Sequence, residues 1–196
     1  MVRLNLGSGP SSAKGWINYD WGLLPLLGRL GLNKWLGGGY NTKWVEVKLH
    51  NLKNRFKENN DVADYIYCSH VLEHFEKYES LKILKECQRL LKSGGKLRVV
   101  LPDLDKVKEI KDPEVFNRVY FGFDKDKFGG WKNRIKVWFI RPHQWMYTAD
   151  SFCKMLEEAG FQKYELKSFG VGNVPDLGEL DLEIHKPLSF YVEAEK

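Results

Sequence analysis

Residues 4–9 read Leu-Asn-Leu-Gly-Ser-Gly and residues 17–20 read Ile-Asn-Tyr-Asp, and these two stretches decide the fold. Each starts as a short apolar strand; the first ends in two glycines one residue apart and the second ends in an acid. Because glycine has no Cβ and tolerates positive φ, Gly7 and Gly9 can form a tight turn that approaches a ligand closely. A carboxylate at the end of the next strand, here Asp20, can accept hydrogen bonds from ribose hydroxyls. The two stretches therefore predict a nucleotide-type cofactor site.

The spacing between the glycines and the acid argues against a dinucleotide. In dinucleotide-binding folds a full helix separates the glycine turn from an acid that lies roughly 20 residues further on. Here Asp20 follows Gly9 closely, and residues 10–15 leave room for no more than a turn or two. The third glycine of the G-x-G-x-x-G pattern would fall at Ser12. A pyrophosphate cradle on a long helix is therefore not expected.

Further motifs follow in order along nearly the whole chain, and they are far more specific as an ordered set than singly. They occupy residues 5–10 and 15–20, residues 67–75 (Tyr-Cys-Ser-His-Val-Leu-Glu-His-Phe), residues 90–97 (Leu-Leu-Lys-Ser-Gly-Gly-Lys-Leu), residues 143–147 (His-Gln-Trp-Met-Tyr) and residues 158–161 (Glu-Ala-Gly-Phe). By these motifs the chain resembles the class I S-adenosylmethionine (SAM)-dependent methyltransferases, in particular their small single-domain bacterial members of the methyltransferase type 11-like group.

The resemblance implies SAM as the cofactor and assigns roles to strand ends. The glycine turn would approach the methionine part of SAM, and Asp20 would bind the ribose hydroxyls. Asn51 stands where the family often has an acid, and its side-chain carbonyl could accept a bond from the adenine amino group. The cofactor-binding residues expected on this basis are Gly7, Ser8, Gly9, Asp20, Trp21, Asn51, Leu52, Ser69 and His70.

Strand patterns that alternate with helix patterns predict an open, mainly parallel α/β sheet. The resemblance sharpens this to a Rossmann-like sheet of about seven strands, mostly parallel with the last strand antiparallel, and helices on both faces. The expected strands lie at residues 3–6, 16–19, 44–47, 63–68, 97–101, 163–168 and 188–194.

Two helices stand out in the sequence. The first is predicted to stop at Ser93-Gly94-Gly95. The second is predicted to begin after Thr148, its N-cap, and to end at Gly160. The helical spacing of the first comes from Leu81, Leu84, Gln88 and Leu91, and the apolar face of the second from Phe152, Met155, Leu156 and Ala159.

Length and composition suit one globular domain. The chain has 196 residues, of which 43% are hydrophobic and 29% charged, with a formal net charge of +5. Three cysteines without metal-type spacing suit free thiols in a reducing compartment. The chain does not begin with a signal-peptide pattern, and no apolar run approaches the roughly 20 residues that cross a bilayer. We therefore expect a single domain over residues 1–196 and a cytoplasmic protein.

Two stretches do not belong to the alternating pattern of strands and helices, and we predict that they cover the site. Residues 21–40 are rich in leucine, and we interpret them as a loop with a short helix over the core, with a substrate lid or a membrane-surface patch as alternatives. Residues 119–147 interleave aromatic side chains with Lys and Arg. These aromatics either belong to the core or stack planar and sugar groups, while the cations attract phosphates.

The run His70-Val71-Leu72-Glu73-His74 also spells H-x-x-E-H, the inverted zinc-protease signature. Two imidazoles four residues apart on a helix can share a metal. Such a site needs a third ligand and a helix that contains the whole motif. Here the motif directly follows an apolar strand, so we expect His70 in the strand-to-helix turn and expect no metal site. A zinc-dependent hydrolase is the alternative that this motif leaves open.

Methyl transfer from a sulfonium is an in-line displacement that needs positioning, and a base where the acceptor must lose a proton. His143, with an unperturbed pKa near 6.5, and Asp103, which follows the fifth strand, are the candidate catalytic residues. His74 is a further candidate base, whereas His185 has no evident partner and is expected to be structural.

The predicted function is SAM-dependent methylation of a small-molecule acceptor, such as an anionic or glycosylated metabolite, a sugar or a lipid. A non-catalytic module that binds SAM or nucleic acid is a second alternative, but the small net charge does not favour nucleic acid. Peripheral membrane contact stays open, and the sequence does not indicate an oligomeric state.

Overall fold

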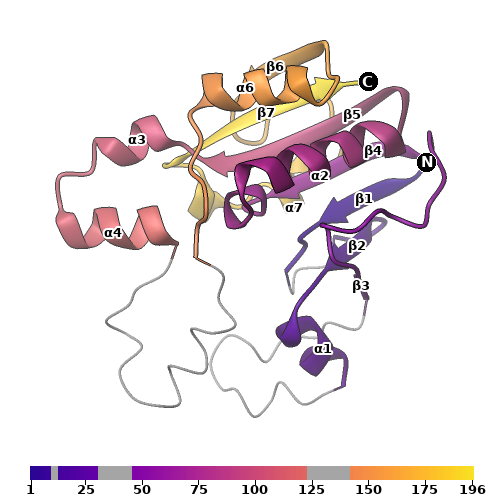
Figure 1. Cartoon of the computed structure of the whole chain (residues 1–196), viewed down its shortest axis with the longest axis horizontal. Helices are drawn as coiled ribbons and strands as arrows, with labels where there is room; N and C mark the ends of the chain where they lie inside the picture. The colour runs from indigo at the N-terminus through magenta and orange to yellow at the C-terminus, as the bar shows by residue number, and fades with distance from the viewer. Residues whose placement is uncertain (10–12, 31–45, 123–141) are drawn as a thin grey trace.

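A seven-stranded sheet forms the centre of the molecule (Figure 1). The computed structural model describes residues 1–9, 13–30, 46–122 and 142–196. The strands are β1 (Arg3–Leu6), β2 (Ile17–Asp20), β3 (Val47–Leu49), β4 (Ala63–Ser69), β5 (Leu91–Pro102), β6 (Lys163–Lys167) and β7 (Ser189–Glu195). They lie in the order β3-β2-β1-β4-β5-β7-β6. Strands β1 to β5 pair in parallel, whereas β7 is antiparallel to both β5 and β6, which confirms the predicted sheet.

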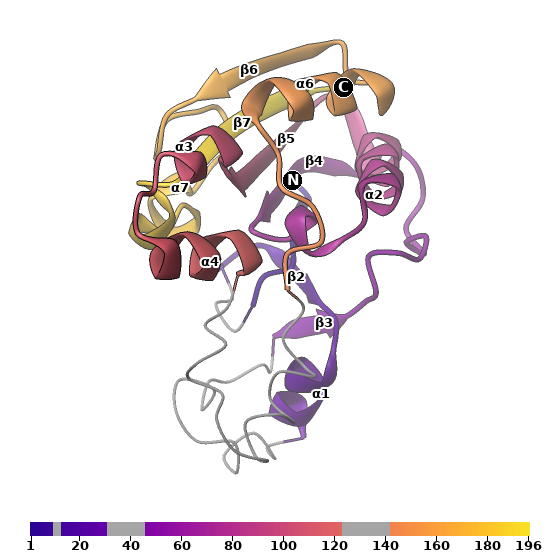
Figure 2. The same cartoon turned by 60° about the vertical axis from the view of Figure 1, so that its left-hand side comes forward.

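The two faces of the sheet are covered by helices of different length. The described helices are α1 (Leu23–Arg29), η3 (Leu72–His74), α2 (Lys77–Leu90), α3 (Leu104–Lys108), α4 (Pro113–Phe121), α6 (Ala149–Glu158), α7 (Leu177–Leu180) and η5 (Glu183–His185). The two longest, α2 and α6, contact each other over one face, and the short α7 lies on the opposite side of β4 and β5 (Figure 2). Among the described helices, none is both long and apolar enough to cross a membrane.

The alternation of side chains along the strands separates two cores. Because successive residues of a strand point to opposite faces, β4 sends Ile66 toward α2 and α6 and Tyr67 toward α7. Likewise β5 contributes Leu97 and Val99 to the larger core and Val100 to the smaller one. The larger core is continuous from β1 to β7, so the carboxyl ends of the parallel strands are held on a rigid frame.

The face that α7 covers also carries a buried ion pair. Arg98 on β5 is fully buried, and its guanidinium pairs with Asp181 (Nη2–Oδ2 2.5 Å) and Glu193 (Nη1–Oε1 3.3 Å). It also donates to the carbonyls of Ser168 and Val171, each at 3.1 Å. These bonds attach the chain between β6 and β7 to the middle of the sheet.

Helix α6 forms as its sequence predicts. The Thr148 hydroxyl accepts from the Ser151 amide at 3.1 Å, and the Ser151 hydroxyl accepts from the Thr148 amide at 3.0 Å. This reciprocal cap satisfies two backbone donors that a helix start otherwise leaves free. Phe152, Met155 and Leu156 are buried, as the periodicity indicates.

The predicted end of α2 is wrong. The helix stops at Leu90, and Leu91 already begins β5. The glycines that were expected to stop the helix lie inside the strand, at a register shift between β4 and β5. A Cβ on Gly95 would lie 2.9 Å from the Lys92 carbonyl oxygen, so this irregularity needs glycine. The buried face of α2 is accordingly rotated from the predicted one and consists of Ser80, Ile83, Leu84, Cys87 and Leu90.

Other expectations match in part. The strand predicted at residues 44–47 shares Val47 with β3, and residues 44 and 45 lie outside the described part of the chain. Helix α1 supplies the short helix expected in the first cover segment, of which residues 31–40 are also not described. All three cysteines are free thiols, as the sequence predicts.

Candidate functional site

A cavity of about 280 Å³ opens at the point where the strand order reverses, between β1 and β4. In open α/β sheets, ligands bind beyond the carboxyl ends of the strands at such a point. Four of the predicted cofactor residues line one side of the cavity: Gly7, Ser8, Gly9 and Ser69. The other side comes from the segment that carries α7 and η5, through Glu179, Leu180, Leu182 and His185. The structure therefore brings the turn after β1 and the end of β4 to one hollow.

The glycine turn is held against β2 by backbone hydrogen bonds. The amides of Gly7 and Ser8 both donate to the Tyr19 carbonyl, at 2.8 and 3.1 Å. Gly7 has φ 68° and Gly9 has φ 59°, which lie in the left-handed region that favours glycine. A Cβ on Gly7 would lie 2.2 Å from Cγ2 of Val71. The turn thus needs glycine at residue 7 for its backbone conformation and for space.

Replacement of Gly7 by alanine should destabilise the protein by about 3 kcal/mol. Left-handed backbone costs a residue with a Cβ roughly 1–2 kcal/mol, and the clash with Val71 adds overpacking of about 1–3 kcal/mol. Gly9→Ala is the matched control, because Gly9 has the same backbone conformation and its Cβ would meet open space. Urea unfolding measures both variants. Equal losses of stability would contradict the steric role of Val71.

Asp20 joins the end of β2 to the glycine turn. Its Oδ2 accepts from the Gly9 amide at 2.8 Å, and its Oδ1 accepts from the Trp21 amide at 2.6 Å. Burial raises the pKa of Asp20, and these two amide bonds partly oppose the rise. A carboxylate has about four lone-pair sites, so Asp20 keeps acceptor capacity for two hydroxyls of a ligand.

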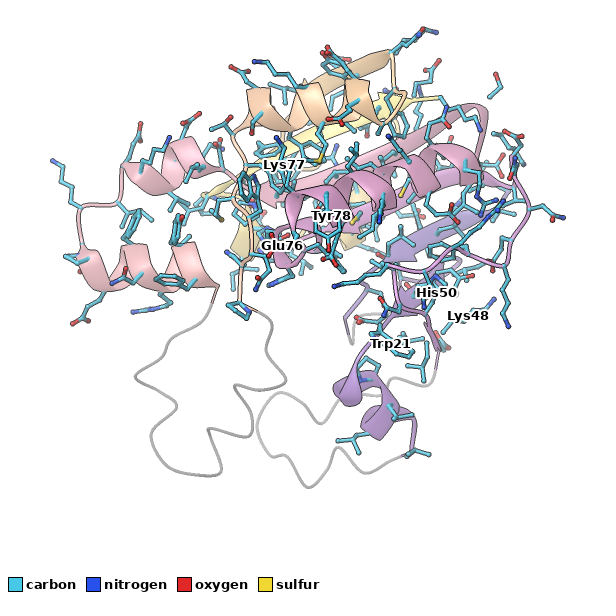
Figure 3. All side chains as sticks on the ribbon, viewed as in Figure 1. Trp21, Lys48, His50, Glu76, Lys77 and Tyr78 are labelled. Carbon is cyan, nitrogen blue, oxygen red and sulfur yellow. The ribbon has the colours of Figure 1, made fainter. Side chains whose placement is uncertain are left out.

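The five other predicted cofactor residues do not line the cavity; they are Asp20, Trp21, Asn51, Leu52 and His70. Trp21 follows β2 above α1 (Figure 3), and 55% of its surface is exposed. The side-chain oxygen of Asn51 accepts from the Lys53 amide at 3.1 Å, which forms a local turn. Leu52 is buried in the larger core. In these positions, none of the side chains of Trp21, Asn51 and Leu52 borders the cavity at the glycine turn.

His70 lies in the turn between β4 and η3, as the sequence predicts. Its φ of 53° is left-handed, and its Nε2 lies 3.0 Å from the Ser189 hydroxyl. Its ring stacks on that of His185, with centroids 3.6 Å apart, so the expectation that His185 has no partner is wrong. Because the H-x-x-E-H run begins in this turn and continues into a 3₁₀ helix, it is not the single α-helix that the zinc-hydrolase signature needs.

The stacked His185 should make stability sensitive to acid. Burial and, secondarily, the neighbouring His70 lower the pKa of His185 to about 4. A histidine in the unfolded chain titrates near 6.5, so the unfolded state takes up the proton first and stability falls as pH drops from about 6.5 toward 4. His185→Phe keeps a stacked ring and removes the titration, and it should reduce this loss. Thermal unfolding at about pH 7 and about pH 5 tests this; an undiminished loss in the variant would contradict it.

The two candidate catalytic residues lie in different surroundings. Asp103 is the N-cap of α3, where its Oδ1 accepts from the Asp105 amide at 3.1 Å. His143 lies against Glu73 and His74 of η3, and its ring centroid is 5.0 Å from that of His74. Burial lowers the pKa of His143 to about 4. Neither residue lines the cavity at the glycine turn.

Sequence reasoning missed one side of the cavity. Tyr67 and Asn5 lie on the strands themselves and point to the face of α7, which alternation along β4 and β1 could have indicated. Glu179, Leu180 and Leu182 belong to a segment far along the chain, and no motif marks them. Their placement depends on the buried pair of Arg98 and Asp181.

Comparisons with known proteins agree with this fold. A family described as a methyltransferase domain matches residues 17–166. A SAM-dependent methyltransferase from Methanosarcina mazei shares the fold at 17% identity and a TM-score of 0.59, over 99% of this chain and 91% of that one. One from Mesorhizobium loti shares it at 15% identity and a TM-score of 0.54, over 100% and 90%.

Longer proteins also share the fold. Human N-acetylserotonin methyltransferase, solved in complex with SAM, matches at 14% identity and a TM-score of 0.54, over 100% of this chain and 47% of that one. The chain spans about half the length of this enzyme and 52% of a similar structure from Nostoc punctiforme. No curated protein matches the sequence. The family match covers most of the chain and includes the end of β2 and β4 with its following turn. The chain therefore belongs to the methyltransferase domain family, and it shares its fold with SAM-dependent methyltransferases.

Proposed function

We propose that this enzyme transfers the methyl group of SAM in line to a small-molecule acceptor, such as a sugar, a lipid or another metabolite. The observation that carries the proposal is the cavity at the reversal of strand order, with the glycine turn on one side and η5 on the other. In the reaction the methyl–sulfur bond breaks, the electron pair stays on sulfur, and the acceptor atom forms the new bond to carbon. The enzyme contributes chiefly the alignment of the two reactants.

The cofactor would lie along the carboxyl ends of β1, β2 and β4. Backbone groups of Gly7, Ser8 and Gly9 would face the methionine part, and Asp20 would accept from the ribose hydroxyls. In this proposal Trp21, Asn51 and Leu52 border the adenine, and Ser69 and His70 face the cofactor from β4. Asp20 supports the assignment best, because two backbone amides already fix the direction of its carboxylate.

The acceptor would bind between these strand ends and the two cover segments, residues 21–40 and 119–147, within one domain over residues 1–196. The second segment is rich in aromatic and basic residues, which suits a glycosylated or anionic molecule. Most of that segment, residues 123–141, lies outside the described residues. A cytoplasmic location is part of the proposal, and the three free thiols support it.

Asp103 and His143 are the proposed catalytic residues on the acceptor side. Nδ1 of His143 lies 3.1 Å from the Tyr120 carbonyl, which can only accept, so this nitrogen carries a proton and Nε2 keeps its lone pair. That nitrogen could take a proton from an acceptor hydroxyl.

A labelled-methyl screen tests the proposed acceptor class. Purified enzyme with methyl-labelled SAM is offered pools of glycosides, anionic metabolites, lipids and oligonucleotides, and labelled products are identified by mass spectrometry. We expect label in a small molecule and release of S-adenosylhomocysteine, both lost in Asp20→Ala. Label transferred to oligonucleotides alone would contradict a small-molecule acceptor.

A further inference from the structure

Three side chains with metal-binding chemistry meet beside η3. Glu73 and His74 come from η3, and His143 comes from the residues just before α6. One ligand atom from each lies within 4.8 Å of those of the other two. Ligand atoms around a tetrahedral Zn²⁺ lie about 3.4 Å apart, so small movements of these side chains would let a single ion contact all three. Glu73 and His74 belong to the H-x-x-E-H motif, whereas His143 comes from outside it and takes the place that the motif would give to His70.

Glu73 provides the strongest argument for a cation site. Its side chain is fully buried, and within the described residues neither carboxylate oxygen has a hydrogen-bond donor. Its Oε1 lies 3.2 Å from Nδ1 of His70, but this contact lacks hydrogen-bond alignment. Burial of a carboxylate without a donor is unfavourable, and a bound cation would remove that cost.

The two histidines are also prepared to bind a cation. Nδ1 of His143 donates to the Tyr120 carbonyl, which leaves the lone pair of Nε2 available. Metal-binding histidines commonly donate their other ring nitrogen to a carbonyl or carboxylate in this way. Nδ1 of His74 is buried and has no hydrogen-bond partner among the described residues.

Backbone bonds hold the three residues together without any ion. The Glu73 carbonyl accepts from the amides of Gln144 and Trp145, at 2.7 and 3.2 Å. The His143 amide donates to the Phe121 carbonyl at 3.0 Å, so the end of α4 fixes the other side. The cluster is therefore preorganised, and ordering it would add little to the cost of binding.

We propose that Glu73, His74 and His143 bind one divalent transition-metal ion, of which Zn²⁺ is the reference case. One carboxylate and two imidazoles suit such an ion and suit Mg²⁺ poorly. Three protein ligands leave a coordination position open. This site departs from the sequence expectation of a metal-free protein, and it makes His143 a ligand rather than a general base.

The position of the metal site suggests that the open coordination position binds an oxygen of the methyl acceptor. This part of the inference rests on the proposed function. Glu73 contacts His70, and His70 stacks on His185, which lines the cofactor cavity. An oxygen of the acceptor bound to the metal would thus lie on the side of β4 where the methyl group is expected. A metal ion lowers the pKa of a bound hydroxyl, so a hydroxylated acceptor could release its proton to water without a dedicated base.

Cobalt spectroscopy on the tag-free full chain tests the site. After treatment with a chelator, the protein is titrated with Co²⁺, whose visible absorption reports nitrogen and oxygen ligands. We expect one equivalent to bind, and we expect Glu73→Gln, His74→Ala and His143→Ala each to weaken binding by at least about 10-fold. His50→Ala is the control, because His50 lies after β3 beside Phe56 and outside the cluster, and it should bind as the wild type does.

Thermal unfolding with and without Zn²⁺ distinguishes a variant that has lost metal binding from a variant that does not fold. Zn²⁺ should raise the melting temperature of the wild type and of His50→Ala but not of Glu73→Gln, whose size is unchanged. A wild type that binds no Co²⁺ and gains no stability from Zn²⁺, or a Glu73→Gln variant that binds as tightly as the wild type, would overturn the proposal. SAM binding by the chelator-treated protein is measured separately. If SAM binds and the metals do not, the metal site fails while the proposed function stands.

Discussion

Asp20→Ala should weaken SAM binding by on the order of 100-fold or more. Two hydrogen bonds from the ribose to a charged group are worth about 1.5–3 kcal/mol each, and each 1.4 kcal/mol is about tenfold in affinity. The substitution also removes the hydrogen bond that the Gly9 amide donates to Asp20 at 2.8 Å. The glycine turn therefore loses a contact with the end of β2. Isothermal titration calorimetry with SAM and S-adenosylhomocysteine measures the change.

Asp20→Asn removes the negative charge of the side chain but keeps its size, so it separates the effect of charge from the effect of shape on SAM binding. The amide keeps one acceptor oxygen and the size of the side chain, but it cannot accept from both backbone amides and both hydroxyls. We expect an affinity between those of the wild type and Asp20→Ala. Thermal unfolding of the three proteins shows whether the turn remains folded. Undiminished SAM binding by a folded Asp20→Ala protein would exclude Asp20 from the cofactor site.

Asp181→Ala should destabilise the protein by about 3–5 kcal/mol, because it leaves the buried guanidinium of Arg98 without its nearest carboxylate. Asp181 also accepts from the Tyr67 hydroxyl at 3.0 Å and from the Gly170 amide at 2.9 Å. These bonds position the residues between β6 and β7 that line the cavity. SAM affinity should therefore fall together with the free energy of unfolding, and urea unfolding and calorimetry measure the two.

An exposed ion pair provides the control. Asp105 and Lys108 pair at 3.3 Å on α3, and both side chains are mostly exposed. Asp105→Ala should change stability by no more than about 1 kcal/mol, since exposed pairs contribute little. Similar losses of stability in Asp105→Ala and Asp181→Ala would contradict the claim that the buried Arg98–Asp181 pair stabilises the protein more than an exposed pair does.

The sequence predicted features that depend on neighbouring residues. The glycine turn, the acid that ends β2 and the cap of α6 each follow from a few consecutive side chains. The position of His70 also followed, because an apolar strand ends directly before it. Helix α2 ended early because Leu91 pairs with Ala63 on β4, a contact that no local pattern contains.

Features that join distant segments were not predictable from the sequence. The side of the cavity opposite the glycine turn depends on the Arg98–Asp181 pair, whose members lie on either side of α6 in the chain. Glu73 and His74 carried a recognisable motif, but His143 reaches them through backbone bonds to Glu73 and Phe121. The helical spacing within the motif pairs His70 with His74, whereas the structure gathers His143 with Glu73 and His74.

A nuclear magnetic resonance titration of the labelled protein with S-adenosylhomocysteine tests the central claim most directly, because it locates the cofactor on the chain. The predicted result is saturable binding with the largest amide shifts at Gly7, Ser8, Gly9 and Ser69, and with changes at Asp20. Absence of binding at high micromolar ligand, or shifts that leave the glycine turn and the end of β4 unchanged, would contradict the proposed site.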